Sequence, residues 1–99
     1  MGQEVFAANP APDLGAALAR LAKDGVTCQV LMVDGELRMP TLPPPASWHD
    51  VRLRTPAGTV ALKRRPDGVA VVVFGNAGPD VMTICRRVAD ALAVSDSAP

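Results

Sequence analysis

Aromatic residues, cysteines and histidines are scarce in this 99-residue chain, and each shortage excludes a class of function. Aromatic side chains make up 3% of the chain and tyrosine is missing, so a single-strand binder would have almost no rings on which to stack bases. His49 and the distant Cys28 and Cys85 show neither zinc-ligand spacing nor a placement suited to nucleophilic catalysis. We therefore expect no enzyme activity, no metal and no cofactor, with both cysteines reduced and packed as small hydrophobic side chains.

Net charge and long hydrophobic runs are lacking as well. Ten basic residues balance ten acidic ones, whereas a dedicated nucleic-acid-binding protein normally carries a clear basic excess. No apolar run approaches the roughly 20 residues that a membrane span needs, and no signal peptide is visible at the N-terminus. The expectation is a cytoplasmic protein of bacterial type, without a membrane, whose partner is another protein or a second copy of itself.

The residues that are present predict a single α+β domain. We expect this domain over residues 13–94, between a flexible arm at residues 1–12 and a disordered tail at residues 95–99. Hydrophobic residues make up 48% of the chain, which is enough for one core at this length. The predicted order is helix, five strands, helix, and the simplest arrangement is a five-stranded antiparallel sheet with two helices packed on one face.

Two segments have the apolar spacing of amphipathic helices. The first covers residues 13–24, because Asp13 can cap its start and Gly25 can end it in a left-handed conformation. The second begins at Asp80, and it has the cleanest apolar stripe in the chain. The stripe consists of Val81, Ile84, Cys85, Val88 and Leu92.

Five segments between the helices have the composition or the alternation of β-strands. They are residues 26–33, 36–39, 50–55, 59–65 and 69–74. Asp34-Gly35 is a strong hairpin signal between the first two, and a proline-rich connector leads to the third. The turn at residues 55–58 sets the next pairing, and it places three basic residues together on one face of the sheet. These are Arg52, Arg54 and Lys63.

The last predicted strand, residues 69–74, is apolar on both faces, which is typical of a central strand that is covered twice. Two helices can cover one face of the sheet. We expect Val71 and Val73 on the other face, beside the three basic residues, where nothing obvious in the chain is left to cover them. The pattern therefore predicts an association surface made of these valines and the basic side chains.

Three features allow both a structural and a functional interpretation. The basic side chains can form a solvated face that discourages aggregation, or contact an acidic partner. Trp48 can anchor the proline-rich loop on the core, which we favour, or stand exposed as an interface hot spot. The Gly75–Asp80 loop can be a plain connection, which we also favour, or hold an anion at the helix N-terminus. It lacks the lysine of a P-loop and the full spacing of a dinucleotide-binding motif.

The segment DVRLRTPAGTVALKRRPDGVAVVVFGNAG, followed by DVMTICRRVADAL, resembles the end of the roadblock/dynein light chain family. The first helix and first hairpin of that family have counterparts in residues 13–24 and 26–39. The family places a second helix where this chain has PTLPPPASWHD, which puts the usual dimer geometry of the family in doubt. The resemblance implies a non-enzymatic dimeric scaffold of the kind that regulates small GTPases or motors, with no catalytic residues.

The function predicted from these features is a non-enzymatic interaction or regulatory scaffold module that associates through its sheet. One alternative is a chaperone-like protein that adds an extended segment of a partner to a sheet edge. Another is a small anion-binding domain that uses the loop before the last helix.

Overall fold

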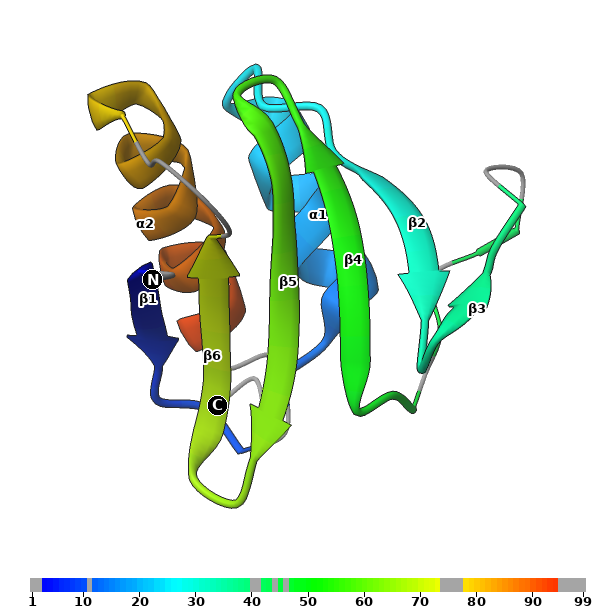
Figure 1. The fold of residues 1–99 in the computed structure, drawn as a ribbon. Helices are drawn as coiled ribbons and strands as arrows, with labels where there is room; N and C mark the ends of the chain where they lie inside the picture. The colour runs from blue at the N-terminus through cyan, green and yellow to red at the C-terminus, as the bar shows by residue number, and fades with distance from the viewer. Residues whose placement is uncertain are drawn as a thin grey trace.

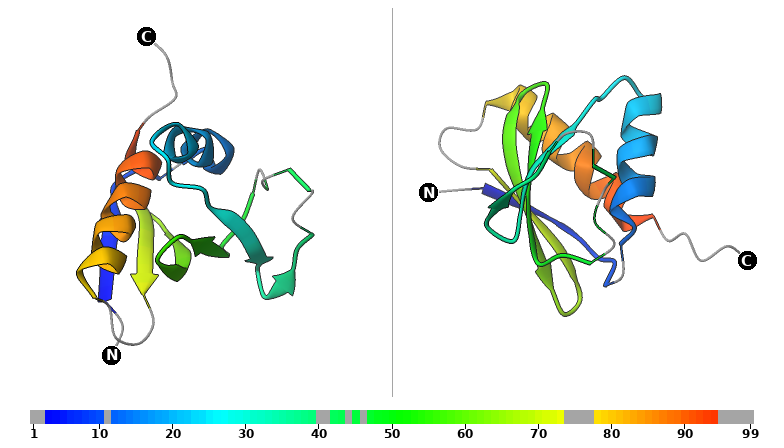
Figure 2. Two further views of the ribbon diagram at one scale, coloured as in Figure 1. Left: turned by 90° about the horizontal axis from the view of Figure 1, so that it is seen from above. Right: turned by 90° about the vertical axis from the view of Figure 1, so that its right-hand side faces the viewer.

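The computed structural model describes residues 3–10, 12–39, 42–43, 45, 47–73 and 78–94. They form an open antiparallel sheet with two helices on one of its faces (Figures 1 and 2). The predicted α+β class and the placement of both helices on one face are confirmed. The sheet has six strands, so the prediction of five is wrong by one.

In the described part of the chain, six strands and two helices follow one another in the order β-α-β-β-β-β-β-α. The strands are β1 (Gln3–Ala7), β2 (Gln29–Val33), β3 (Glu36–Leu37), β4 (Asp50–Thr55), β5 (Gly58–Arg65) and β6 (Gly68–Val73). The helices are α1 (Leu14–Lys23) and α2 (Pro79–Ala93). In space the strands lie in the order β1-β6-β5-β4-β2-β3, so β1 and β3 form the two edges of the sheet. Neither helix, among the described residues, is long and apolar enough to cross a membrane.

The strand missing from the prediction is β1, which lies in the segment expected to be a flexible arm. All five of its residues pair with β6. Ala7 belongs to the core, and the partly buried Val5 packs against it. A short segment of this composition has little strand signal of its own, and its structure depends on a partner more than 60 residues away in the chain.

The first helix is capped as the sequence predicts. The carboxylate of Asp13 accepts a hydrogen bond from the amide of Ala16 at 3.0 Å, a contact of a kind that stabilises a helix by about 1 kcal/mol. After the helix, Gly25 has a φ of 81°, which is the left-handed conformation expected of a glycine at this position. Leu14, Ala17 and Leu21 face the core from α1.

The last helix begins one residue earlier than predicted, at Pro79. Proline suits the first helical position because a backbone amide there has no acceptor within the helix. The absence of an amide proton in proline therefore costs no hydrogen bond. The core-facing residues of α2 are Cys85, Val88, Ala89, Ala91 and Leu92. Both helices therefore direct their apolar stripes to the same side of the sheet, and they also pack on each other.

The hairpin of β4 and β5 has the predicted register. Leu53 lies opposite Val60 and Thr55 lies opposite Gly58. The buried Thr55 closes the turn, because its hydroxyl donates to the carbonyl oxygen of Gly58 at 2.6 Å and accepts from the amide of Ala57 at 3.2 Å. The turn therefore fixes which residues of the two strands share a face.

The inner face of the sheet, which is the side toward α1 and α2, carries the core. Val60 and Leu62 are 0% exposed there. The pairing of β5 with β6 sets Val73 opposite Val60 and Val71 opposite Leu62, and residues opposite each other share a face. Val71 and Val73 are accordingly 0% and 3% exposed beneath the helices. The prediction that they lie on an uncovered face is wrong.

Trp48 closes one end of this core. Its side chain is 2% exposed, and the guanidinium of Arg64 lies 5.1 Å from the centre of its ring. Arg64 also donates to the carbonyl oxygen of Pro10 at 3.1 Å, which ties the connection before α1 to the same corner. The prediction of core anchoring is confirmed, so Trp48 is not an exposed hot spot.

Candidate interaction surface

The outer face is the side of the sheet away from α1 and α2. No described helix or strand lies over this face, and Figure 1 views the sheet from this side with both helices behind it. The alternation along β4, β5 and β6 and their register place six side chains at its centre. They are Arg52, Arg54, Ala61, Lys63, Ala70 and Val72.

Ala61 is a residue of the outer face with very low solvent exposure. It is 0% exposed, yet it does not belong to the core that the helices cover. Its neighbours across the sheet are Arg52 on β4 and Val72 on β6. The aliphatic stem of Arg52 and the valine side chain are therefore the described groups placed to keep water from Ala61. Both Arg52 and Val72 are half-buried.

Ala70 lies in a similar position, between Lys63 on one side and Phe6 on the other. It too is 0% exposed, while Phe6 is 42% exposed. The ring of Phe6 also reaches over Gly68, where an added Cβ would lie 2.7 Å from the ring and would collide with the carbonyl oxygen of Ala7. Glycine at position 68 therefore permits the close approach of β1 to β6.

Charge on this part of the outer face is predominantly positive. Arg52 lies 3.7 Å from the carboxylate of Asp50, and Arg65 lies 3.5 Å from that of Glu4. Two further cations, Arg54 and Lys63, have no carboxylate within ion-pair distance in the described part of the chain. Two carboxylates thus offset only two of the four cations, so the face keeps a positive potential.

A second apolar area adjoins the outer face at the β3 edge. A hollow of about 480 Å³ is lined by Gln29, Leu31, Met32, Leu37, Arg38 and Met39. Leu37 and Met39 are 86% and 65% exposed. These two side chains give this end of the molecule its most exposed described apolar groups.

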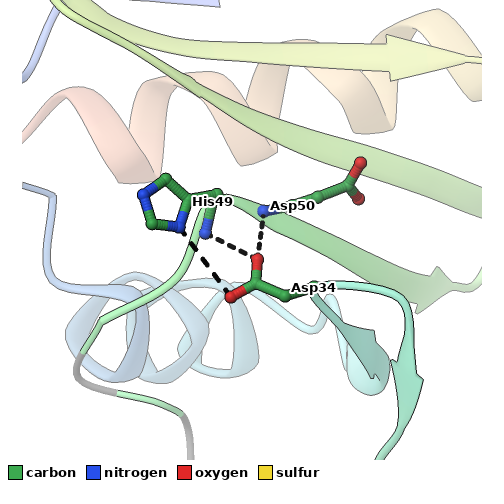
Figure 3. A network of polar contacts seen from close by, with 3 residues as sticks. All are labelled: Asp34, His49 and Asp50. Atoms are coloured by element: carbon green, nitrogen blue, oxygen red, sulfur yellow. Dashed lines mark hydrogen bonds and ion pairs between the residues drawn. The ribbon is translucent and has the colours of Figure 1, made fainter.

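A network of polar contacts joins the turn after β2 to the start of β4 (Figure 3). Asp34 has a φ of 51°, and one of its carboxylate oxygens accepts from the amides of His49 and Asp50, each at 2.8 Å. Its other oxygen lies 3.9 Å from Nδ1 of His49. The amide of Asp50, then that of His49, lowers the pKa of Asp34. The contacts hold a turn, and the imidazole of His49 is exposed rather than placed for chemistry.

The two cysteines have no feature of a reactive pair. Cys85 is buried, Cys28 is half-buried, and both are free thiols. Burial raises the pKa of each thiol, which disfavours the thiolate that a nucleophile or metal ligand needs. No group of three His, Cys, Asp or Glu side chains that could hold a metal is found among the described residues.

Another hollow, of about 490 Å³, lies between the turn after β4 and one side of α2. Asp24, Asp80 and Arg87 are among its lining residues. It thus mixes both signs of charge with apolar side chains such as Val26 and Ile84.

The structure divides the predicted site residues between two places. Arg52, Arg54 and Lys63 lie together on the outer face, as the register predicts. Val71 and Val73 lie on the inner face, and Trp48 lies in the core, so none of these three contributes to an exposed surface. The anion-binding alternative depends on a loop whose residues 75–77 are outside the described residues.

Phe6 and Val72 on the outer face were not predicted from the sequence. Phe6 had no signal, because β1 itself was not predicted. Val72 could have been found by counting back from the second turn, in which Arg65 lies opposite Gly68. The same counting places Val72, and not Val71, on the face of the basic residues.

Comparison with known proteins identifies no relative. No protein-family model, no curated protein and no solved structure matches the chain. The resemblance to the roadblock/dynein light chain family stays a prediction.

Proposed function

We propose that this protein is a non-enzymatic interaction module that binds an acidic segment of a partner protein on its outer face. The observation that carries the proposal is a sheet face over which no described helix or strand lies, and on which Arg54 and Lys63 stand beside half-buried apolar groups. A scaffold that works through its sheet remains the function that these features support best.

The positive charge supports an acidic partner. Arg54 is exposed and Lys63 is half-buried, and Arg52 lies between them on the same face. Carboxylates of a partner would meet these groups at the surface, where complementary charge contributes more to association rate and specificity than to affinity. We expect binding to weaken as salt is added, because the Debye length falls to about 10 Å at 0.1 M ionic strength.

Apolar contact would supply most of the affinity. Val72 and Met32 are half-buried on the outer face, where Met32 lies opposite Arg52. Phe6 and Leu37 are 42% and 86% exposed. Covering such side chains stabilises a complex by roughly 25 cal/mol for each Å² of apolar surface removed from water. A partner segment that alternates acidic and apolar residues matches this mixture.

Composition favours a protein over a nucleic acid as the partner. The chain has zero formal net charge and 3% aromatic residues, whereas nucleic-acid binding draws on a basic excess and on stacking rings. The proposed location is the cytoplasm, and the free thiols of Cys28 and Cys85 are in keeping with a reducing compartment.

The proposal is tested with a fluorescent peptide of alternating glutamate and leucine, and with a lysine–leucine peptide of equal length. We expect the acidic peptide alone to bind, and the double variant Arg54→Glu with Lys63→Glu to bind it at least tenfold more weakly. The matched control is Arg86→Glu with Arg87→Glu, which reverses two charges on the exposed side of α2. Equal weakening by both double variants, or binding of the basic peptide, would overturn the proposal.

A further inference from the structure

The two edges of the sheet differ in how readily each could pair with a further strand. An edge strand presents unpaired backbone groups, and proteins usually blunt it by shortness, proline, lysine, a bulge or a covering segment. β3 and β1 are the edges of this sheet, and each can be examined for these devices.

The β3 edge is blunted. β3 has two residues, Glu36 and Leu37, and it follows a tight turn in which Asp34 and Gly35 both have positive φ. In the segment after β3, the guanidinium of Arg38 donates to the carbonyl oxygen of Pro43 at 2.7 Å, so this segment bonds within its own loop. Two residues offer too few backbone groups for stable pairing with another strand.

The described residues of the β1 edge have few of these devices. β1 is five residues long, it pairs with β6 at every position, and it has no proline, lysine or bulge. Its one charged side chain, Glu4, lies 3.5 Å from the guanidinium of Arg65, so the edge carries little net charge. No described strand pairs with β1 on its other side.

We propose that β1 pairs antiparallel with the β1 strand of a second copy of this chain, which joins two sheets into one. The proposal rests on a different observation from the proposed function and does not depend on it. A second copy fits this edge because the sequence of β1 is self-complementary in one register and because the chain has zero formal net charge, so two copies do not repel each other at long range.

The favoured register is centred on Val5. It sets Val5 opposite Val5 of the second copy, Glu4 opposite Phe6, and Gln3 opposite Ala7, so that all five residues pair. Residues that share a face then remain on the same face in both copies. No like charges lie opposite each other, which favours this pairing.

The neighbouring registers are worse. A shift by one residue would set outer-face residues opposite inner-face residues. A shift by two in one direction would set Glu4 opposite Glu4, with like charges facing, and a shift by two in the other direction would set Phe6 opposite Phe6. Either shift would leave three paired residues instead of five. Charge and face therefore select one register among these.

The expected dimer is weak and reversible. Five paired residues on each side form a contact well below the roughly 1,200–2,000 Å² of a standard interface. The joined sheet would bring the Phe6 side chains of the two copies near each other, and it would make the two outer faces continuous.

Sedimentation of the full chain over a wide concentration range tests the pairing first. We expect a reversible monomer–dimer equilibrium, and slower amide hydrogen exchange for residues 3–7 at the dimer end of the range. A monomer at every concentration would overturn the proposal. So would a dimer whose β1 amides exchange as fast as those of the monomer.

Disulfide trapping tests the register. In the proposed dimer the two Val5 Cα atoms lie roughly 4.5–5.5 Å apart, which is within disulfide range, so Val5→Cys should cross-link under mild oxidation. Phe6→Cys in the same strand should not cross-link, because diagonal neighbours are about 7–8 Å apart. Leu37→Cys tests the β3 edge, and the parent protein measures the background from Cys28 and Cys85. Trapping through Phe6→Cys or Leu37→Cys, and not through Val5→Cys, would contradict the proposal.

Discussion

The inner and outer faces of β4, β5 and β6 reach low exposure by different means. On the inner face, Leu62 and Val71 are 0% exposed because α1 and α2 cover them. On the outer face, Ala61 and Ala70 reach the same value between neighbours with longer side chains. A residue can therefore be buried on this sheet although no described helix lies over it.

The largest expected effect on stability comes from comparing two adjacent valines on the inner and outer faces. Val71 faces the helices, whereas Val72 faces outward and is half-buried. We expect Val71→Ala to lower the free energy of unfolding by about 2–3 kcal/mol, since it opens a cavity in a packed core. Val72→Ala should cost less than about 1 kcal/mol, because neighbouring side chains can close over the site. Chemical denaturation measures both values, and equal losses would contradict the assignment of the two faces.

The next test addresses the contact between β1 and β6. Gly68→Ala should destabilise the protein by about 1–3 kcal/mol, because the added Cβ meets the backbone of Ala7 and the ring of Phe6. The effect should be local, with faster amide exchange in β1 than elsewhere in the sheet. Gly58→Ala is the control, because that position has open space around it, although its φ of 138° also carries strain. Unchanged exchange in β1 of the Gly68 variant would show that the close approach is absent.

The smallest expected effect concerns the turn that joins β2 to β4. Hydrogen bonds from Asp50 and His49 lower the pKa of Asp34 in the folded protein. A carboxylate with a lowered folded-state pKa stabilises the fold above its unfolded-state pKa, and that contribution is lost as the pH falls through the folded-state pKa. We therefore expect a small loss of stability on acidification below about pH 4. Asp34→Asn should remove this part of the pH dependence, and identical pH profiles for both proteins would contradict the role of the turn.

Local sequence features predict much of the fold. Asp13 and Gly25 correctly mark the ends of the first helix. The turn at residues 55–58 correctly sets the register of β4 and β5, and with it the placement of Arg52, Arg54 and Lys63. In each case the information lies within a few residues of the structure that it predicts.

The failures have two physical causes. β1 could not be predicted, because its pairing depends on β6, more than 60 residues away in the chain, and its own residues have weak preferences. Val71 and Val73 were predictable but were assigned to the wrong face. The doubly apolar pattern of β6 does not say which face is which, and only the turn between Arg65 and Gly68 does. The candidate site could therefore be located by its charges and not by its apolar residues.

Methyl chemical shifts during titration with the acidic peptide test the central claim most directly. The methyl groups of Val72 and Met32 report on the outer face, and those of Val71 and Val88 report on the core beneath the helices. We predict shifts at Val72 and Met32 that saturate with the peptide and little change at Val71 and Val88. Shifts confined to α2, or a saturating titration that leaves Val72 unchanged, would contradict binding on the outer face.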